Sequence, residues 1–262
     1  MWREVQVRMN FKSISILLGG TLATEWAVGL IPFGRLPIPD YMKGIAYHLI
    51  SGILWVLLIR VAFQNSLARL LIKRDKSILI GIGIVLVLSL GSVSGIDYKN
   101  TPILDICIGF IFSLFIGIDE ELFSRGLVFT AFEYKGVLFA TVLSSIHFGL
   151  LHIGNVIWGG QSFAYTSGQI VSAASFGFLA CGLLLFTGSI WIPILFHGLN
   201  DFSMQFQTQT QFTQQVTGST EWSGVAIVVT LNLLIGLALI YFSSPQSFQR
   251  LEVFAAKLGL VE

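Results

Sequence analysis

The chain has 262 residues, of which 54% are hydrophobic and only 11% charged, and its formal net charge is +1. Soluble domains carry about 25% charged residues. The composition therefore excludes an ordinary soluble protein. It predicts an integral membrane protein that lies in the lipid bilayer. The small net charge argues against nucleic acid as a partner, because nucleic-acid binding favours strongly basic chains.

Apolar stretches of about 20 residues, the length that crosses a bilayer, recur along the whole chain. We therefore expect an all-α polytopic membrane protein, a single membrane domain over residues 1–262 with about eight transmembrane helices. The first stretch follows basic residues but has no small-residue cleavage site, so it should remain as an anchor. The expected helices lie at 13–32, 44–64, 77–95, 102–132, 136–153, 163–187, 190–204 and 222–242, the seventh being short.

Lysine and arginine are distributed unevenly between the two sides of these helices. With the amino terminus inside, the inner side holds eleven basic residues and the outer side only Arg35, Lys43 and Lys99. Basic residues accumulate in cytoplasmic loops. The pattern predicts that both termini are cytoplasmic, and a prokaryotic plasma membrane is the expected location. The inner residues are Arg3, Arg8, Lys12, Arg60, Arg69, Lys73, Arg74, Lys76, Lys135, Arg250 and Lys257.

An acidic pair followed by an arginine lies inside the fourth stretch, IFSLFIGIDEELFSRGLVFTAF. Ionisable groups at membrane depth are costly and usually mark a functional site. Glu121 and Arg125 are four residues apart, so they should pair on one helix face. Glu120 is rotated by about 100° and should face a cavity. Because two acids face one base, acid–base chemistry is favoured over a purely structural ion pair.

Two later stretches carry similar polar groups. His152 follows Phe148 by four residues in FGLLH, while His147 lies on another face, and spacing alone does not choose between the two histidines. His197 and Asp201 form an i, i+4 pair in HGLND. Such a pair can orient the imidazole through the carboxylate or ligate a metal. The alternative is a helix-end hydrogen bond. The polar groups of all three stretches point to one intramembrane polar site.

Other polar residues receive a structural interpretation. Glu25, His48 and Asp105 lie in or near apolar stretches without a spaced partner, so we expect interhelical hydrogen bonds or interfacial positions. The polar run at 205–215, QFQTQTQFTQQ, is interpreted as a solvated connector on the outer side. A lip over the site is the less favoured alternative for that run.

Taken in order, EELFSR at 120–125, FGLLH at 148–152 and HGLND at 197–201 resemble three motifs of the CAAX-protease and bacteriocin-processing (Abi) family. These intramembrane proteases are related to the type II CAAX prenyl endopeptidase. The resemblance covers about residues 102–205, a family-like catalytic core. It implies an eight-helix fold and an intramembrane endopeptidase. Its substrate would be a membrane-associated protein or peptide of CAAX type, prenylated in some cases, or of bacteriocin or pheromone type.

Carried over by position, the resemblance implies that Glu120 and His152 activate the attacking water. His197 and Asp201 would stabilise the oxyanion or place the water. The last position is Asp here, where CAAX endopeptidases tend to have Asn, and an ionised Asp cannot donate to an oxyanion. A protonated Asp201, or one that orients His197, would resolve this difference.

The remaining motif residues have supporting roles under the same resemblance. Glu121 and Arg125 would hold the site together, and Phe148 would contact the substrate. The family is commonly labelled metalloprotease, and zinc is the metal that a shell of nitrogen and oxygen ligands would suit. No HExxH occurs, so metal-free water activation is slightly favoured and no cofactor is assigned. A bound metal would be ligated by Glu120, His152, His197 and Asp201.

Two other functions stay open from the sequence. A membrane protein of the same family could act without catalysis, as a bacteriocin self-immunity factor that works by binding. Buried Glu, His and Asp side chains also form proton relays, so a proton-coupled transporter is the third reading. The transporter is disfavoured because no inverted repeat or pair of broken helices is visible.

Overall fold

The structure is a computed structural model that describes residues 35–62, 76–157, 159–206 and 209–244, with isolated positions between 21 and 32. Every regular element in these ranges is helical, which confirms the all-α expectation. The first expected helix and Glu25 lie largely outside the described residues. The elements are α2 (Asp40–Ala62), α3 (Lys76–Leu88), α4 (Leu90–Ser94), α5 (Ile103–Glu121), η3 (Leu122–Phe129), α6 (Thr130–Phe132), η4 (Glu133–Lys135), α7 (Val137–Leu151), α8 (Gly154–Ile157), α9 (Phe163–Thr187), α10 (Trp191–Phe202), η5 (Ser203–Phe206), α11 (Gln209–Thr217) and α12 (Trp222–Phe242).

Four helical segments are long and apolar enough to cross a membrane: Asp40–Val61, Val137–Ile157, Phe163–Thr187 and Trp222–Phe242. The last of these, α12, exposes large apolar side chains over most of its surface. Exposed apolar surface of that extent is stable against lipid and costly against water. The protein is accordingly an integral membrane protein.

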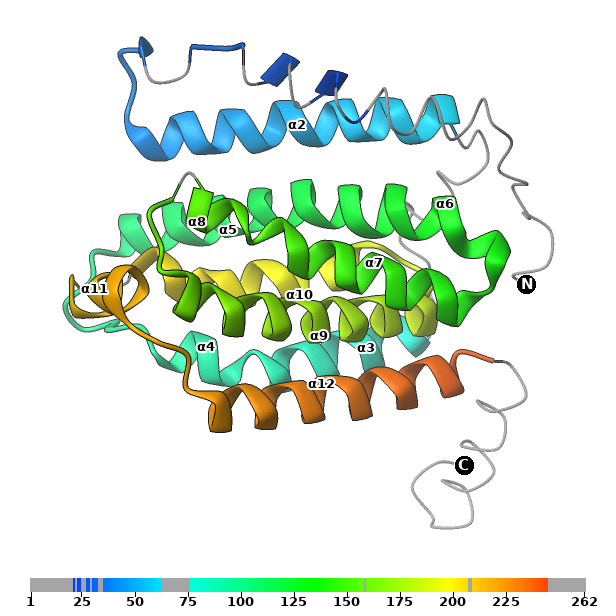
Figure 1. The fold of residues 1–262 in the computed structure, drawn as a ribbon. Coiled ribbons are helices and arrows are strands. Elements are labelled where there is room, and N and C mark those ends of the chain that lie inside the picture. The colour runs from blue at the N-terminus through cyan, green and yellow to red at the C-terminus, as the bar shows by residue number, and fades with distance from the viewer. Residues whose placement is uncertain are drawn as a thin grey trace.

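The helices lie side by side in one bundle with α5, α9 and α10 at its centre (Figure 1). Helix α2 packs on one side of α5, and α10 packs on the other. Helix α9 contacts α7, α10 and α12, so it connects these three helices. The short helices α4, α8 and α11 gather at one end (Figure 1). This arrangement brings the three motif-bearing helices α5, α7 and α10 together.

Glycine allows α5 and α10 to approach backbone to backbone. A Cβ atom at Gly117 would lie 2.9 Å from the Ile194 carbonyl oxygen, and one at Gly198 would lie 3.2 Å from Leu114 Cα. A Cβ atom does not fit at 2.9 Å from a backbone oxygen, and at 3.2 Å the neighbouring backbone would have to shift, so larger residues would push the two helices apart. The close contact is what places His197 directly against the acidic end of α5.

The helix expected over 102–132 contains a π-helical segment, η3, which begins directly after the acidic pair. A π turn contains more residues than an α turn, so it rotates the residues that follow relative to those before it. Such segments occur frequently at functional sites. Arg125 lies inside η3 and is completely buried.

The polar run at 205–215, expected to be a solvated connector, contributes to η5 and α11, and the side chains of Thr213 and Gln214 are exposed. Glutamine has good intrinsic helix propensity, and the segment that follows is tied to the start of α9. Ser162 donates its backbone N–H to Gln215 O at 3.1 Å and its hydroxyl to Gly218 O at 2.7 Å. The Gly168 backbone N–H donates to Thr220 Oγ1 at 3.0 Å. These contacts hold the end of α11 and the residues after it against the start of α9.

Candidate active site

The buried centre of the site is a three-residue ion-pair network between α5, η3 and α10. Arg125 donates from a guanidinium nitrogen to Glu121 Oε1 at 3.0 Å, as the i, i+4 spacing predicted. His197 Nδ1 lies 2.9 Å from the same oxygen. The side chains of Glu121 and Arg125 are fully buried and that of His197 is 5% exposed. Burial of a charge is tolerated when it is paired in this way.

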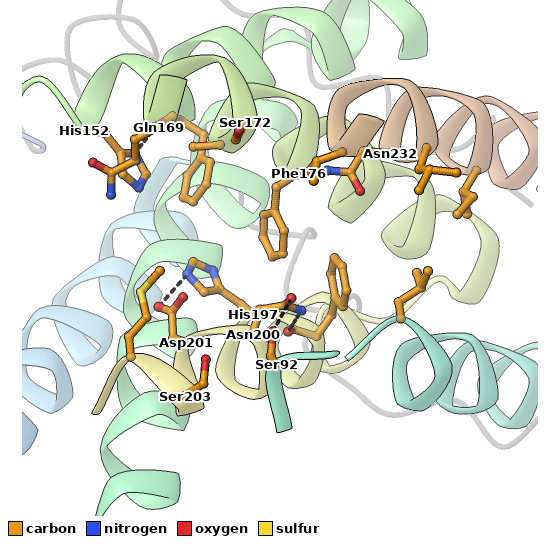
Figure 2. A pocket seen from close by; sticks show the side chains of 18 residues that line it. Ser92, His152, Gln169, Ser172, Phe176, His197, Asn200, Asp201, Ser203 and Asn232 are labelled. Carbon is orange, nitrogen blue, oxygen red and sulfur yellow. Dashed lines mark hydrogen bonds and ion pairs between the residues drawn. The ribbon is translucent and has the colours of Figure 1, made fainter. Parts of the chain in front are cut away.

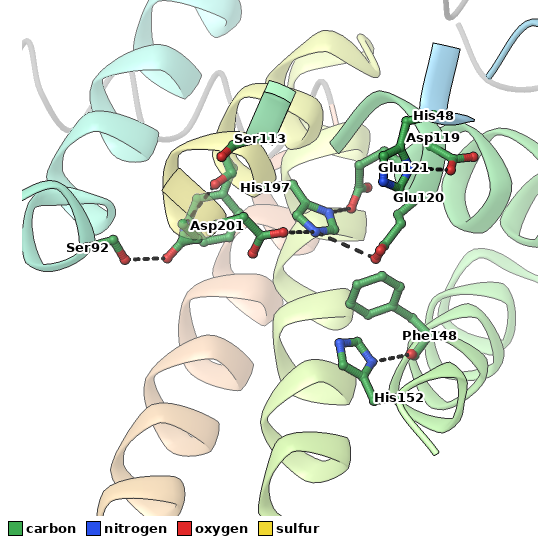
Figure 3. Close-up of polar contacts among 12 residues, drawn as sticks. His48, Ser92, Ser113, Asp119, Glu120, Glu121, Phe148, His152, His197 and Asp201 are labelled. Atoms are coloured by element: carbon green, nitrogen blue, oxygen red, sulfur yellow. Dashed lines mark hydrogen bonds and ion pairs between the residues drawn. The ribbon is translucent and has the colours of Figure 1, made fainter. Parts of the chain in front are cut away.

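The second nitrogen of His197 faces two further carboxylates. Its Nε2 lies 3.3 Å from Asp201 Oδ2, on the next turn of α10, and 3.7 Å from Glu120 Oε2 (Figure 3). An imidazole can donate from both nitrogens only when it carries both protons. Carboxylates on both sides therefore favour a protonated His197. The i, i+4 contact predicted for His197 and Asp201 is confirmed.

Glu120 differs from its neighbour in exposure. Its side chain is 35% exposed and lines a cavity of about 260 Å³ together with His152, Asn155 and Gln169. The expectation that Glu120 faces a cavity is confirmed. The two acidic residues thus differ: the Glu121 carboxylate is buried and contacts both Arg125 and His197, whereas the Glu120 carboxylate reaches the cavity.

His152 caps the end of α7, with Nδ1 3.2 Å from the Phe148 carbonyl oxygen. It lines both the cavity that contains Glu120 and a second one of about 510 Å³. His147 packs edge-on against Phe123, with ring centroids 5.1 Å apart, and lines neither of these cavities. Of the two histidines that spacing left open, the structure brings His152 to the site.

Phe148 forms an aromatic wall between the two histidines (Figure 3). Its ring centroid lies 5.4 Å from that of His152 and 5.6 Å from that of His197, both edge-on. The Arg125 guanidinium carbon stands 4.6 Å from the same ring centre, a cation–π contact. Phe148 is 2% exposed, so it contributes chiefly by packing around the charged network, while one edge borders the 510 Å³ cavity.

The 510 Å³ cavity lies between two groups of helices, as Figure 2 shows. His152, Gln169 and Ser172 project from one side, and His197 and Asp201 face them from α10. Toward α12 and the end of α3 the walls become mainly apolar, with Leu88, Val228, Leu231 and Ile235 beside Asn232. The cavity is therefore polar at the histidines and apolar at its far end.

Asp119 is a buried carboxylate that sequence reasoning missed. Its Oδ1 accepts from the Ser51 hydroxyl at 2.6 Å and from the Trp55 indole at 2.7 Å, and its Oδ2 lies 2.7 Å from His48 Nδ1. The interhelical hydrogen bond expected for His48 is confirmed, whereas Asp105 is exposed near the start of α5. His48, Ser51 and Trp55 share one face of α2, and that polar face was the available signal.

The donor atoms do not form a metal shell. Among the described residues, no three His, Cys, Asp or Glu side chains converge in an arrangement that could hold a metal ion. His152 lies against Phe148, separated from the His197 and Asp201 pair, so the four ligands named from the sequence do not meet at one point. We therefore assign no step of the chemistry to a metal.

Comparison with known families agrees with this geometry. Residues 102–203 match the family described as "Type II CAAX prenyl endopeptidase Rce1-like". This segment is similar to members of that family. The match covers almost all of the predicted core, residues 102–205, and contains all seven predicted site residues. It confirms the family resemblance. Members of the Rce1-like family are generally proteases. A search among curated proteins gave no match.

Proposed function

We propose that the protein is an intramembrane endopeptidase that hydrolyses a peptide bond of a membrane-associated protein or peptide. The observation that supports this most strongly is the position of Glu120 and His152. They come from different helices, α5 and α7, yet line one cavity beside the buried network of Glu121 and His197. A carboxylate and an imidazole around one space are suited to activating a water molecule. The Rce1-like match of residues 102–203 supports the same reading.

In the proposed reaction, Glu120 takes a proton from a water held between its carboxylate and His152. The oxygen of that water attacks the scissile carbonyl carbon and forms a tetrahedral intermediate. Glu120 then returns the proton to the leaving nitrogen as the C–N bond breaks, giving a carboxylic acid and an amine. Acid–base assistance of this kind contributes about 10²- to 10⁴-fold to the rate.

His197 is proposed to stabilise the negative charge of the intermediate. Its Nε2 points toward the space between Asp201 and Glu120 and would carry a proton when both flanking carboxylates are ionised. Asp201 orients the ring rather than donating to the oxyanion, which gives an ionised Asp a role at this position. Glu121 and Arg125 act as positioning residues, because they fix His197 from the side away from the cavity.

The proposal includes the wider setting of the enzyme. We infer about eight transmembrane helices, both termini in the cytoplasm and a prokaryotic plasma membrane, on the basis of the apolar stretches and the distribution of basic residues. The substrate class is CAAX-type or bacteriocin- and pheromone-type. A binding-only immunity protein and a proton-coupled transporter are the functions against which the test is designed.

The proposal is tested with purified protein in lipid nanodiscs and a panel of quenched fluorescent peptides, prenylated and plain, with apolar carboxyl-terminal ends. We expect the wild type to cleave at least one peptide. Glu120→Gln should lower kcat by about 10²-fold or more, because the amide cannot accept the proton. Asp105→Asn, an isosteric change at an exposed position of the same helix, should leave kcat unchanged.

The outcomes separate the three functions. Loss of cleavage in Glu120→Gln with an unchanged thermal unfolding midpoint supports the endopeptidase. Equal cleavage by wild type and Glu120→Gln removes the proposed mechanism. An immunity protein would protect cells from a bacteriocin equally well with either residue at 120. A transporter would show Glu120-dependent proton flux without peptide cleavage.

A further inference from the structure

A third cavity, of about 830 Å³, lies at the end of the bundle where α11 and the start of α12 approach α9. Its walls are formed mainly by side-chain amides, hydroxyls and glycine backbone. Glu221 is the one charged side chain among the described residues that line it. Neither the sequence motifs nor the proposed chemistry uses this cavity.

Gln169 is the point where this polar cavity meets the two cavities of the candidate active site. It lines the polar cavity, the 260 Å³ cavity with Glu120 and the 510 Å³ cavity with His197, and among the described residues it alone lines all three. Figure 2 shows its amide beside His152. Asn155 also borders the polar cavity and the 260 Å³ cavity, and Ser172 and Met204 border the polar cavity and the 510 Å³ cavity, so Gln169 lies where all three cavities meet.

The orientation of the Gln169 amide is set by its neighbour. Asn155 Nδ2 donates to Gln169 Oε1 at 3.0 Å. This bond occupies one lone pair of the oxygen and directs the Gln169 NH₂ group, a double donor, away from Asn155. A donor held in this way beside His152 is matched to a peptide carbonyl oxygen.

We propose that the polar cavity binds an extended, uncharged polar stretch of the substrate and that Gln169 binds the peptide backbone next to the scissile bond. The inference rests on the endopeptidase function and names the part of the substrate that the enzyme selects. The apolar end of the 510 Å³ cavity then receives the hydrophobic side chains on the other side of the scissile bond.

The chemistry of the walls decides which peptides fit. A peptide group carries one donor and one acceptor, and amide and hydroxyl side chains can satisfy both. A charged substrate residue would lose hydration there without gaining an opposite charge, which is unfavourable. A basic side chain could pair only with Glu221, and an acidic one with no described residue of the lining. An apolar stretch would leave the wall amides unsatisfied.

The test uses full-length protein in lipid nanodiscs and three quenched peptides that share one apolar carboxyl-terminal half. Their other halves consist of Gly, Ser and Gln, of Glu with Gly, or of Leu. Wild type, Gln169→Ala, Gln169→Asn and Asn100→Ala are compared for kcat and KM. Asn100→Ala removes an amide from the exposed loop before α5, outside the three cavities.

We expect the wild type to prefer the Gly-Ser-Gln peptide by about tenfold or more in kcat/KM. Gln169→Ala should lower that value by about 10- to 100-fold, because substrate misplacement of about 1 Å has that effect. It should also reduce the preference among peptides. Gln169→Asn, which keeps the amide, should recover part of the loss, and Asn100→Ala should match the wild type.

Two results would overturn the inference while leaving the endopeptidase intact: equal kcat/KM for Gln169→Ala and wild type, or wild-type cleavage of the Leu peptide as fast as the polar one. Binding provides a separate readout. In a Glu120→Gln background, added Gln169→Ala should weaken the affinity for the Gly-Ser-Gln peptide about tenfold, and an unchanged Kd contradicts the role of Gln169. Absence of cleavage of any peptide by the wild type counts against the endopeptidase, while the Kd values still decide on the cavity.

Discussion

Helix α5 ends with three consecutive carboxyl groups, and the two outer ones are held in contrasting ways. On the α2 side, Asp119 receives hydrogen bonds from a hydroxyl and an indole and contacts an imidazole. On the α10 side, Glu121 is paired with a guanidinium and an imidazole. The first contact can be built from neutral donors, whereas the second needs a permanent cation. Both are buried, so the end of α5 is fastened on two sides.

Glu120 lies between Asp119 and Glu121, and the contacts of these two neighbours determine how it is held. Its neighbours fix the backbone on both sides, so the Glu120 side chain extends into the cavity from a rigid support. The permanent cation, Arg125 of η3, pairs with the same Glu121 oxygen that His197 contacts, so positive charge gathers at this end of the acidic run. The α2 contact serves as an anchor, and the α10 contact combines an anchor with a charge beside the reacting space.

The largest effect on stability is expected from Arg125→Met. The substitution keeps most of the side-chain volume but leaves Glu121 buried without its permanent counter-charge, which typically costs about 3–5 kcal/mol. The free energy of unfolding, measured by SDS titration in mixed micelles, should fall by that amount. His197 should also lose its fixed orientation, so peptide cleavage should fall with it.

Lys43→Met is the matched control for Arg125→Met. Lys43 pairs with Asp40 at 2.9 Å, but the Asp40 carboxyl is 97% exposed, and exposed pairs contribute little. If Arg125→Met were as stable as Lys43→Met, the buried pair of Arg125 with Glu121 would not be the dominant anchor of α5.

A smaller effect is expected from Gly117→Ala. The added Cβ would lie 2.9 Å from the Ile194 carbonyl oxygen, which belongs to backbone and cannot move aside alone. Overpacking of this kind costs about 1–3 kcal/mol. Since α5 and α10 must separate, the distance from His197 to the acidic pair should grow and kcat should fall. The SDS titration and the peptide assay measure the two consequences.

Gly83→Ala provides the comparison on α3, where an added Cβ meets nothing within 4 Å. It should leave the unfolding free energy unchanged or raise it by about 0.5 kcal/mol, through the lower entropy of the unfolded chain. Equal effects of the two substitutions would show that the close approach of α5 to α10 is not needed for the site.

The sequence was sufficient to predict the pairs within each helical segment, but neither the contact of Glu121 with His197 of α10, which lies 76 residues away, nor the α2 contact. Glu121 with Arg125 and His197 with Asp201 are i, i+4 pairs, and such pairs are visible without any tertiary information. Asp119 has no partner within its own helix, because its three partners lie 64 to 71 residues away on α2. Local spacing cannot assign partners across that separation.

Two further features also depended on tertiary packing. The polar run at 205–215 lacks apolar periodicity, and its helical part becomes fixed through hydrogen bonds from the start of α9. The π-helical segment η3 has no sequence signature that distinguishes it from an α-helix. The role of Phe148 as a wall between His152 and His197 likewise required the relative positions of α7 and α10.

The smallest effect is expected on the α2 side, from Asp119→Asn. The amide oxygen can still accept from Ser51 and Trp55, so only the ionic part of the contact with His48 is lost. Removal of a hydrogen bond to a charged group costs about 1.5–3 kcal/mol, and the retained acceptor should place this substitution near the lower end. The SDS titration should show a smaller loss than for Arg125→Met.

The coupling between the two helices can be isolated with Ser51→Ala and the double variant Ser51→Ala/Asp119→Asn. Because the two residues share one hydrogen bond of 2.6 Å, the losses in unfolding free energy should be less than additive. The kcat of Asp119→Asn should stay within about tenfold of wild type, since α10 still holds Glu120 in place. A loss of kcat as large as that of Glu120→Gln would instead place Asp119 in the chemistry and erase the functional difference between the two sides of α5.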